Sequence, residues 1–152
     1  MDFEFRVATL EDLDAIMGLE NSTFESDAWS TKSMSSELAS PHTYFLFAFD
    51  PAKPDALTGY GGLLAPLNSG DGDIQTLAVA PDARRTGLGR TLVLALMAEA
   101  KSRGARQVFL EVRADNPNAQ ALYDSLGFEQ VAVRAKYYQP DGVDAKVMRV
   151  TL

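Results

Sequence analysis

The sequence predicts an α/β fold in which about seven strands form a mixed central sheet flanked by about four helices. Short apolar segments with a period of two residues alternate with segments whose apolar residues recur every three or four positions. Glycine and proline residues punctuate the boundaries between these segments. With 46% hydrophobic residues in a chain of 152, the sequence has enough apolar surface for one buried core, so residues 1–152 are expected to form a single domain.

The first third of the sheet is expected to form an antiparallel meander, and two helices are expected near the start of the chain. Phe3 to Val7 alternate as a first strand, and Thr9 is a candidate N-cap for a helix that weakens at residues 20–23. Ser30 is a candidate cap for a second, short helix that ends before Pro41. The next strands are expected at 44–49, 57–65 and 74–80, with loops at 50–56 and 66–72.

The second half of the chain begins with a long amphipathic helix from about Gly87 to Arg103, which Gly104 ends as a C′ glycine. Its expected inward face consists of Leu88, Leu92, Ala95, Leu96, Met97 and Ala100. A strand at 107–113 follows, then a short helix that begins at Asn118 or Ala119 and ends at Gly127. Two final strands are expected at 128–138 and 145–152, on either side of a turn at 140–142.

Composition excludes several classes of function. A formal net charge of −7 argues against nucleic acid as a partner, and it favours a cationic amine or a basic peptide. Without cysteine and with one histidine, His42, the chain is expected to hold no metal. The N-terminus lacks the features of a signal peptide, and no apolar run approaches the ~20 residues of a membrane span. The expected location is therefore the cytoplasm, with no membrane partner.

One stretch stands out, where a strand passes into the long helix through Arg84-Arg85-Thr86-Gly87-Leu88-Gly89. Two glycines at a helix start let a phosphate approach the bare backbone N–H groups, and Arg90 adds a further local positive charge. The alternative is a tight strand-to-helix turn that binds nothing. Neither nucleotide fingerprint fits, because Leu92 replaces the third glycine of the dinucleotide motif and no Gly-Lys-Ser/Thr end is present.

This stretch resembles the Arg/Gln-x-x-Gly-x-Gly/Ala signature of the Gcn5-related N-acetyltransferases (GNAT), and the similarity extends over nearly the whole chain. Within that superfamily, several segments are similar to the bacterial ribosomal-protein alanine N-acetyltransferases. They are residues 27–30, 73–79, 110–116, 121–123 and 126–128, and the pair Tyr137-Tyr138. The resemblance implies a GNAT-type sheet whose strands diverge after Val79 and Val112 to form a cleft for acetyl-coenzyme A.

The resemblance also implies the cofactor contacts. The glycine loop would hold the pyrophosphate, and the strand at 77–79 would pair with the pantetheine arm through its backbone and supply an oxyanion donor. Asn116 would touch the cofactor or serve only as a turn former. The implied cofactor-binding residues are Leu77, Ala78, Val79, Arg84, Arg85, Thr86, Gly87, Leu88, Gly89, Arg90 and Asn116.

Glu111 is the candidate general base. It interrupts an apolar strand, where a carboxylate is costly unless it is paired, hydrogen-bonded or neutralised. It is therefore either a base with a raised pKa or a structural residue, paired with Arg113 or exposed on a sheet edge. An α-amino group has a pKa of about 7.7–8.0 and must lose a proton before it attacks. The resemblance places the base of the family at Glu111, acting through water.

Three aromatic residues complete the candidate site. Tyr123 either packs in the core with Phe128 or, as the resemblance implies, protonates the departing thiolate of coenzyme A; the two roles are compatible. Trp29 and Tyr138 belong either to the core or to the rim of the acceptor groove. Direct transfer without an acyl-enzyme is expected, since the chain has no cysteine and no serine with a suitable base.

The resemblance implies that the acceptor is a basic protein N-terminus, the alanine of a small-subunit ribosomal protein. One alternative is an enzyme that acetylates several protein N-termini or a small amine. Another is a protein without catalytic activity, such as an acyl-coenzyme A sensor or a subunit of a larger assembly. The presence of both Glu111 and Tyr123 argues against this last class, which requires neither residue.

Overall fold

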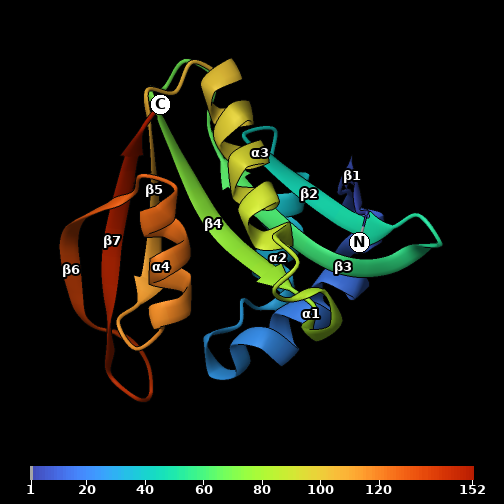
Figure 1. The fold of residues 1–152 in the computed structure, drawn as a ribbon, viewed down its shortest axis with the longest axis horizontal. Helices are drawn as coiled ribbons and strands as arrows, with labels where there is room; N and C mark the ends of the chain where they lie inside the picture. Colours follow the sequence, from blue (N-terminus) through green and yellow to red (C-terminus); the bar gives the residue numbers. More distant parts are fainter. Residues whose placement is uncertain (1) are drawn as a thin grey trace.

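The computed structural model describes residues 2–152, in which seven strands form one sheet in the order β1-β2-β3-β4-β5-β7-β6. The strands are β1 (Glu4–Val7), β2 (Thr43–Asp50), β3 (Lys53–Leu64), β4 (Asp71–Val79), β5 (Gln107–Arg113), β6 (Glu129–Tyr138) and β7 (Val143–Thr151). The helices are α1 (Leu13–Phe24), α2 (Thr31–Ala39), α3 (Leu88–Ser102) and α4 (Pro117–Ser125), with short 3₁₀ turns η1 (Leu10–Asp12), η2 (Glu25–Asp27) and η3 (Pro81–Ala83). The predicted fold class is confirmed (Figure 1).

The sheet is antiparallel from β1 to β4, as the meander prediction required. Helix α3 then connects β4 to β5, which is its parallel neighbour. The last two strands are antiparallel to their neighbours, and β7 lies between β5 and β6. The mixed sheet therefore has one parallel junction, between β4 and β5, and the candidate site lies beside it.

Local signals set the helix ends. Thr9 forms a capping box with Asp12, whose carboxylate also pairs with Arg6 at 2.7 Å. The Ser30 hydroxyl accepts a hydrogen bond from the Ser33 N–H and caps α2. Helix α3 is followed by Gly104 at a φ of +89°, which is the left-handed geometry of a C′ glycine.

Four expected boundaries are wrong. Helix α1 continues through residues 20–23 to Phe24, because Glu20 is buried and hydrogen-bonded there. The 50–56 loop is largely strand, since β3 begins at Lys53 and pairs back with β2 after a tight turn. Helix α4 begins at Pro117, capped by Asn116, and β4 begins at Asp71, where it pairs with β5.

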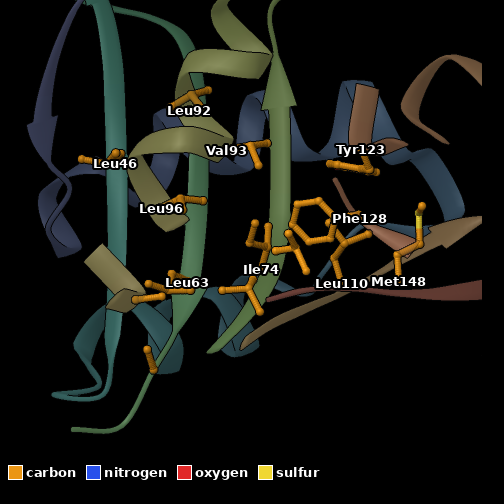
Figure 2. Close-up of a cluster of buried hydrophobic side chains, with 14 of the residues drawn as sticks. Leu46, Leu63, Ile74, Leu92, Val93, Leu96, Leu110, Tyr123, Phe128 and Met148 are labelled. Atoms are coloured by element: carbon orange, nitrogen blue, oxygen red, sulfur yellow. The ribbon is translucent and has the colours of Figure 1, made fainter. Parts of the chain in front are cut away.

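The core has two parts, one on each face of the sheet. Helices α1 and α2 cover one face, where Ile16, Met34 and Phe47 are buried. Helices α3 and α4 cover the other, where the buried cluster includes Leu46, Leu63, Ile74, Leu92, Val93, Leu96, Leu110, Tyr123, Phe128 and Met148 (Figure 2). The expected inward face of α3 omitted Val93, which is fully buried, whereas Ala95 and Met97 are only partly buried.

No helix within residues 2–152 is both long and apolar enough to cross a membrane.

Candidate active site

A cleft opens where β4 and β5 part. The two strands pair only from Asp71↔Gln107 to Ile74↔Leu110, and beyond that point they diverge (Figure 1). The pairing of β4 with β3 shifts at the same place, because Gly62 lies opposite Thr76 and Leu63 lies opposite Ile74. Gln75 is therefore the extra residue of a β-bulge, which bends and twists β4 away from β5. The predicted divergence is present and begins at Ile74, before the Val79 that the sequence indicated.

Two adjoining cavities occupy this region. The Tyr123 cavity, of about 530 Å³, is lined by residues of β4, β5, β6, α1, α4 and the turns beside them, including Leu77, Glu111, Asn116, Tyr123 and Tyr138. The Asp73 cavity, of about 550 Å³, is lined by Asp27, Trp29, Asp73, Glu111, Tyr137 and Tyr138 among others. Trp29, Glu111 and Tyr138 line both, so the predicted base and both predicted rim residues lie where the cavities meet.

The predicted phosphate loop lies at the end of β4, outside the lining of both cavities. Arg85 and Gly87 adopt left-handed conformations, with φ of +62° and +85°, and Leu88 then begins α3. The Gly87 carbonyl accepts the first helical hydrogen bond, from the Thr91 N–H at 3.0 Å. No side chain caps this helix, so the N–H groups of Leu88, Gly89 and Arg90 point along the axis without an acceptor in the helix. This arrangement favours an anion.

The polar side chains of the loop shape its turn. The Thr86 hydroxyl donates to the Ala83 carbonyl at 2.5 Å, and Arg84 Nε donates to the Val79 carbonyl at 3.1 Å. Arg90 reaches across to Ser125 on α4, with 2.9 Å between Nη1 and Oγ. Arg84, Arg85 and Arg90 are all exposed, and the loop is a concentration of positive charge in an acidic chain.

The backbone of β4 presents free groups to the cleft. The Ala80 N–H donates to the Thr58 carbonyl on β3, and in an antiparallel ladder this orientation repeats every second residue. The N–H of Ala78 therefore points to β3, whereas the N–H groups of Leu77 and Val79 point to the edge that β5 has left. Of the predicted cofactor contacts Leu77, Ala78 and Val79, only Leu77 and Val79 have a backbone N–H that is free to bind the cofactor.

Glu111 lies on the solvent-facing side of β5, between the buried residues Leu110 and Val112. Its carboxylate accepts a hydrogen bond from Arg134 Nη1 of β6 at 2.9 Å, and its side chain is 30% exposed. The pair with Arg113 that the sequence suggested is wrong, because the partner is Arg134. β5 is an interior strand of the sheet, but Glu111 lies just beyond its last pair with β4, at the open edge of the cleft. The carboxylate faces both cavities.

Tyr123 projects from α4 with its ring in the core and lines the Tyr123 cavity. The ring packs edge-to-face on Phe128, with 5.8 Å between ring centroids, in the buried cluster that also includes Leu110 and Met148 (Figure 2). Burial raises the pKa of Tyr123 to about 12, so its hydroxyl stays protonated at neutral and mildly alkaline pH. The predicted packing on Phe128 is confirmed, and it is compatible with a hydroxyl directed at the cavity.

Asn116 is a helix cap in this structure. Its side-chain oxygen accepts a hydrogen bond from the Ala119 N–H at 3.1 Å, which satisfies one free donor at the start of α4. Asn116 also lines the Tyr123 cavity. The turn-forming interpretation is therefore met, and the predicted cofactor contact stays a prediction.

Glu20 lies in the lining of the candidate site, although the sequence did not single it out. Only 1% of it is exposed, yet its carboxylate lines the Tyr123 cavity. It accepts hydrogen bonds from the Thr76 hydroxyl at 2.9 Å, from the Trp29 N–H at 3.0 Å and from the Tyr60 hydroxyl. It thereby ties α1 to the bulged part of β4 and to the segment before α2. A glutamate on an apolar helix face next to Leu19 was the available signal.

Asp73 is the second residue that was not anticipated. Desolvation, and then the nearby carboxylates of Glu111 and Asp71, raise the pKa of Asp73. With Asp27, Asp73 and Glu111 in its lining and no lysine or arginine, the Asp73 cavity is negatively charged. A cationic ligand is favoured there. No cluster of metal-ligating side chains occurs within residues 2–152.

Comparison with known proteins identifies the family. The family model described as Acetyltransferase (GNAT) family matches residues 13–128, more than half of the chain. The chain belongs to this family. It is therefore an acetyltransferase, and its co-substrate is acetyl-coenzyme A, as in the GNAT family. The three free amides at the start of α3, the open edge of β4 and the adjoining Tyr123 cavity fit a ligand with a pyrophosphate at one end and an extended amide-bearing arm.

Three relatives show how far the similarity extends. The crystal structure of the ribosomal-protein-S18-alanine N-acetyltransferase from Escherichia coli superposes with a TM-score of 0.87 at 30% identity, covering 99% of this chain and 94% of that one. The N-alpha-acetyltransferase RimI of Mycobacterium tuberculosis is 37% identical over 125 residues, 81% of this chain and 75% of the relative. A Mycobacterium leprae protein is 36% identical over 144 residues, and the chain spans only 38% of its length.

Proposed function

We propose that this GNAT acetyltransferase modifies the N-terminal α-amino group of a protein, and that its acceptor is the N-terminal alanine of ribosomal protein bS18. The carboxylate-lined Asp73 cavity carries the proposal, because it favours a cation and because Glu111, the predicted base, lines both it and the adjoining Tyr123 cavity. The names of the Escherichia coli and Mycobacterium tuberculosis relatives support the choice of an N-terminal amine, and the former supports alanine of this ribosomal protein. The proposed place of work is the cytoplasm, where ribosomes are assembled.

Binding of the co-substrate is assigned to backbone groups. The amides at the start of α3 would hold the pyrophosphate, with Arg84, Arg85 and Arg90 adding positive charge. The free N–H groups of Leu77 and Val79 would hold the arm along β4 and polarise the acetyl carbonyl. When bound, acetyl-coenzyme A supplies an activated acetyl group as a thioester.

Proton transfer is assigned to Glu111 and Tyr123. Glu111 would accept the proton that the acceptor ammonium must lose before it attacks, directly or through one water. This requires the carboxylate to exchange its ion pair with Arg134, an exchange that costs little because partly exposed pairs contribute about 0–1 kcal/mol. Tyr123 would direct its hydroxyl proton at the sulfur as the thiolate departs. Its raised pKa keeps that proton in place.

A peptide panel tests the proposal. The purified protein is mixed with acetyl-coenzyme A and a peptide of the bS18 N-terminus, and mass spectrometry locates the acetyl group. Matched controls are the same peptide with a blocked N-terminus, the same peptide beginning with residues other than alanine, and a polyamine. Repeated turnover at the free alanine amine is expected. Acetylation of a lysine side chain or the polyamine, equal use of every N-terminus, or binding of acetyl-coenzyme A without transfer would each contradict the proposed acceptor.

A further inference from the structure

Arg113, the last residue of β5, holds a set of contacts for which the proposed chemistry has no use. Its Nε and Nη2 bind the two oxygens of Asp115 at 2.9 and 3.1 Å. Nη2 also donates to Asp141 at 2.5 Å, and Nη1 donates to Asp27. The guanidinium carbon lies 5.0 Å from the centre of the Tyr138 ring. One side chain therefore makes three ion pairs and a cation–π contact while being 22% exposed.

Two of the three carboxylate partners of Arg113 belong to different segments beside the Asp73 cavity. Asp27 ends η2, two residues before Trp29, and forms one wall with it. Asp141 lies in the turn after Tyr138, which forms the other wall. Within residues 2–152, no hydrogen bond or ion pair joins residues 25–30 directly to residues 137–142, and Arg113 is bonded to both. Asp115 differs, because it belongs to the turn that directly follows β5 and carries neither wall.

We propose that Arg113 is a positioning residue that holds the two walls of the acceptor cavity at a fixed separation, and so sets the affinity for the acceptor peptide. This rests on the proposed function, since the Asp73 cavity is taken as the acceptor site. A guanidinium suits the role because its planar fork donates in several directions at once and stacks on an aromatic ring, whereas an ammonium does neither. Without it, Asp27 and Asp141 repel each other, and no other hydrogen bond or ion pair among residues 2–152 joins the two walls.

The net charge of Arg113 and its three carboxylate partners also favours binding of the acceptor peptide. Three carboxylates surround one guanidinium, so the group keeps a negative charge after pairing. Arg113 thus holds carboxylates beside the acceptor cavity without cancelling their attraction for a cationic N-terminus.

Three substitutions each remove one carboxylate charge, and the charge-conserving Arg113→Lys variant separates the positioning role from simple electrostatics. Asp27→Asn and Asp141→Asn each break the ion pair between Arg113 and one wall. Asp115→Asn removes the bidentate ion pair with Arg113 but leaves both walls bonded to it. For the first two variants the KM for the acceptor peptide is expected to rise by about tenfold, which corresponds to about 1.4 kcal/mol. For Asp115→Asn, KM is expected to stay within about twofold, and the Kd for acetyl-coenzyme A is expected to be unchanged in all three.

Arg113→Lys keeps the charge and should still raise KM by about tenfold with kcat little changed. Arg149→Gln is the control for the loss of one charge elsewhere on the protein, because Arg149 is exposed on β7 and lines neither cavity. Melting temperatures of all variants report whether each one folds. The proposal is overturned if Asp115→Asn raises KM as much as the other two do, or if the variants weaken acetyl-coenzyme A binding instead.

A second readout does not depend on the identity of the acceptor. Trp29 is the single tryptophan of the chain and lies two residues from Asp27, so its fluorescence reports on that wall. Quenching by acrylamide should increase in Asp27→Asn and Arg113→Lys and stay at the wild-type value in Asp115→Asn. If no peptide of the panel is acetylated but Trp29 responds this way, the proposed acceptor is wrong and the positioning role holds. An unchanged Trp29 signal in every folded variant contradicts the positioning role.

Discussion

Replacing Tyr123 by phenylalanine should change how the stability of the protein depends on pH. Burial raises the pKa of Tyr123 from 10.0 to about 12 in the folded state. The unfolded chain therefore ionises this hydroxyl first, and the folded state loses stability as pH rises from about 10 to about 12. The full loss above pH 12 is about 2.7 kcal/mol, and at pH 11 it is about 1.4 kcal/mol.

Tyr123→Phe removes this loss because phenylalanine has no proton to give up. The ring and its contact with Phe128 remain, so the fold should be kept. The free energy of unfolding, measured in urea at several pH values between 8 and 11, should fall less steeply for the variant. Relative to wild type, the variant should gain about 1.4 kcal/mol over that range. Tyr137→Phe is the control, since Tyr137 is 47% exposed and should give a smaller gain.

A difference in stability that stays constant from pH 8 to pH 11 would refute the burial of the hydroxyl that this reasoning requires. The same variant also tests the proposed chemistry, because loss of a proton donor should lower kcat by about 10²-fold or more. Since the wild-type hydroxyl is protonated well beyond pH 10, any fall in kcat below that pH must come from another group. A wild-type kcat in Tyr123→Phe would leave Tyr123 with a packing role only.

Three further substitutions test other parts of the structure. Glu111→Gln should lower kcat by about 10²-fold or more at pH 6.5 and much less at pH 9, where the acceptor amine is already largely neutral; a pH-independent loss would speak against a base. Gly87→Trp should raise the Kd for acetyl-coenzyme A, measured by calorimetry, by at least about tenfold. A Cβ at Gly87 meets no protein atom within 4 Å, but any side chain is strained at its φ of +85°, so the melting temperature must show that the variant folds. Wild-type affinity in the folded variant would refute the anion site. Gly62→Ala should destabilise the protein by about 1–3 kcal/mol, because its Cβ would lie 2.4 Å from the buried ring of Phe45; an unchanged melting temperature would contradict that packing.

Local sequence signals were sufficient for most of the fold. The caps at Thr9 and Ser30, the glycine after α3 and the alternating apolar strands act over a few residues, and each predicted its element. The errors arose where distant residues decide the outcome. Helix α1 continues past Glu20 because Thr76, Tyr60 and the Trp29 backbone satisfy that carboxylate, and these partners are as many as 56 residues away.

In the candidate site, too, local signals predicted some residues, and contacts between distant residues were missed. The sequence motifs indicated the residues that line the cleft, because Glu111, Asn116 and Tyr123 belong to a strand, a turn and a helix that follow one another. They did not indicate the Arg134 partner of Glu111, which depends on how β6 pairs with β7, and that pairing is irregular. Asp73 was likewise missed, because its proximity to Glu111 follows from the short parallel junction of β4 with β5.

The bulge at Gln75 means that the cleft depends on the number of residues in β4. With one residue fewer, β4 would keep its register with β3 and no longer bend, and its free edge would be able to bond to β5 along the rest of its length. A deletion of Gln75 would thus tend to produce a continuous, closed sheet that folds well and has no place for the co-substrate arm. Without a ligand, the open edge of β4 lacks the hydrogen bonds that it would otherwise make with β5. An extended ligand arm that pairs with β4 as an added strand would supply hydrogen bonds in their place.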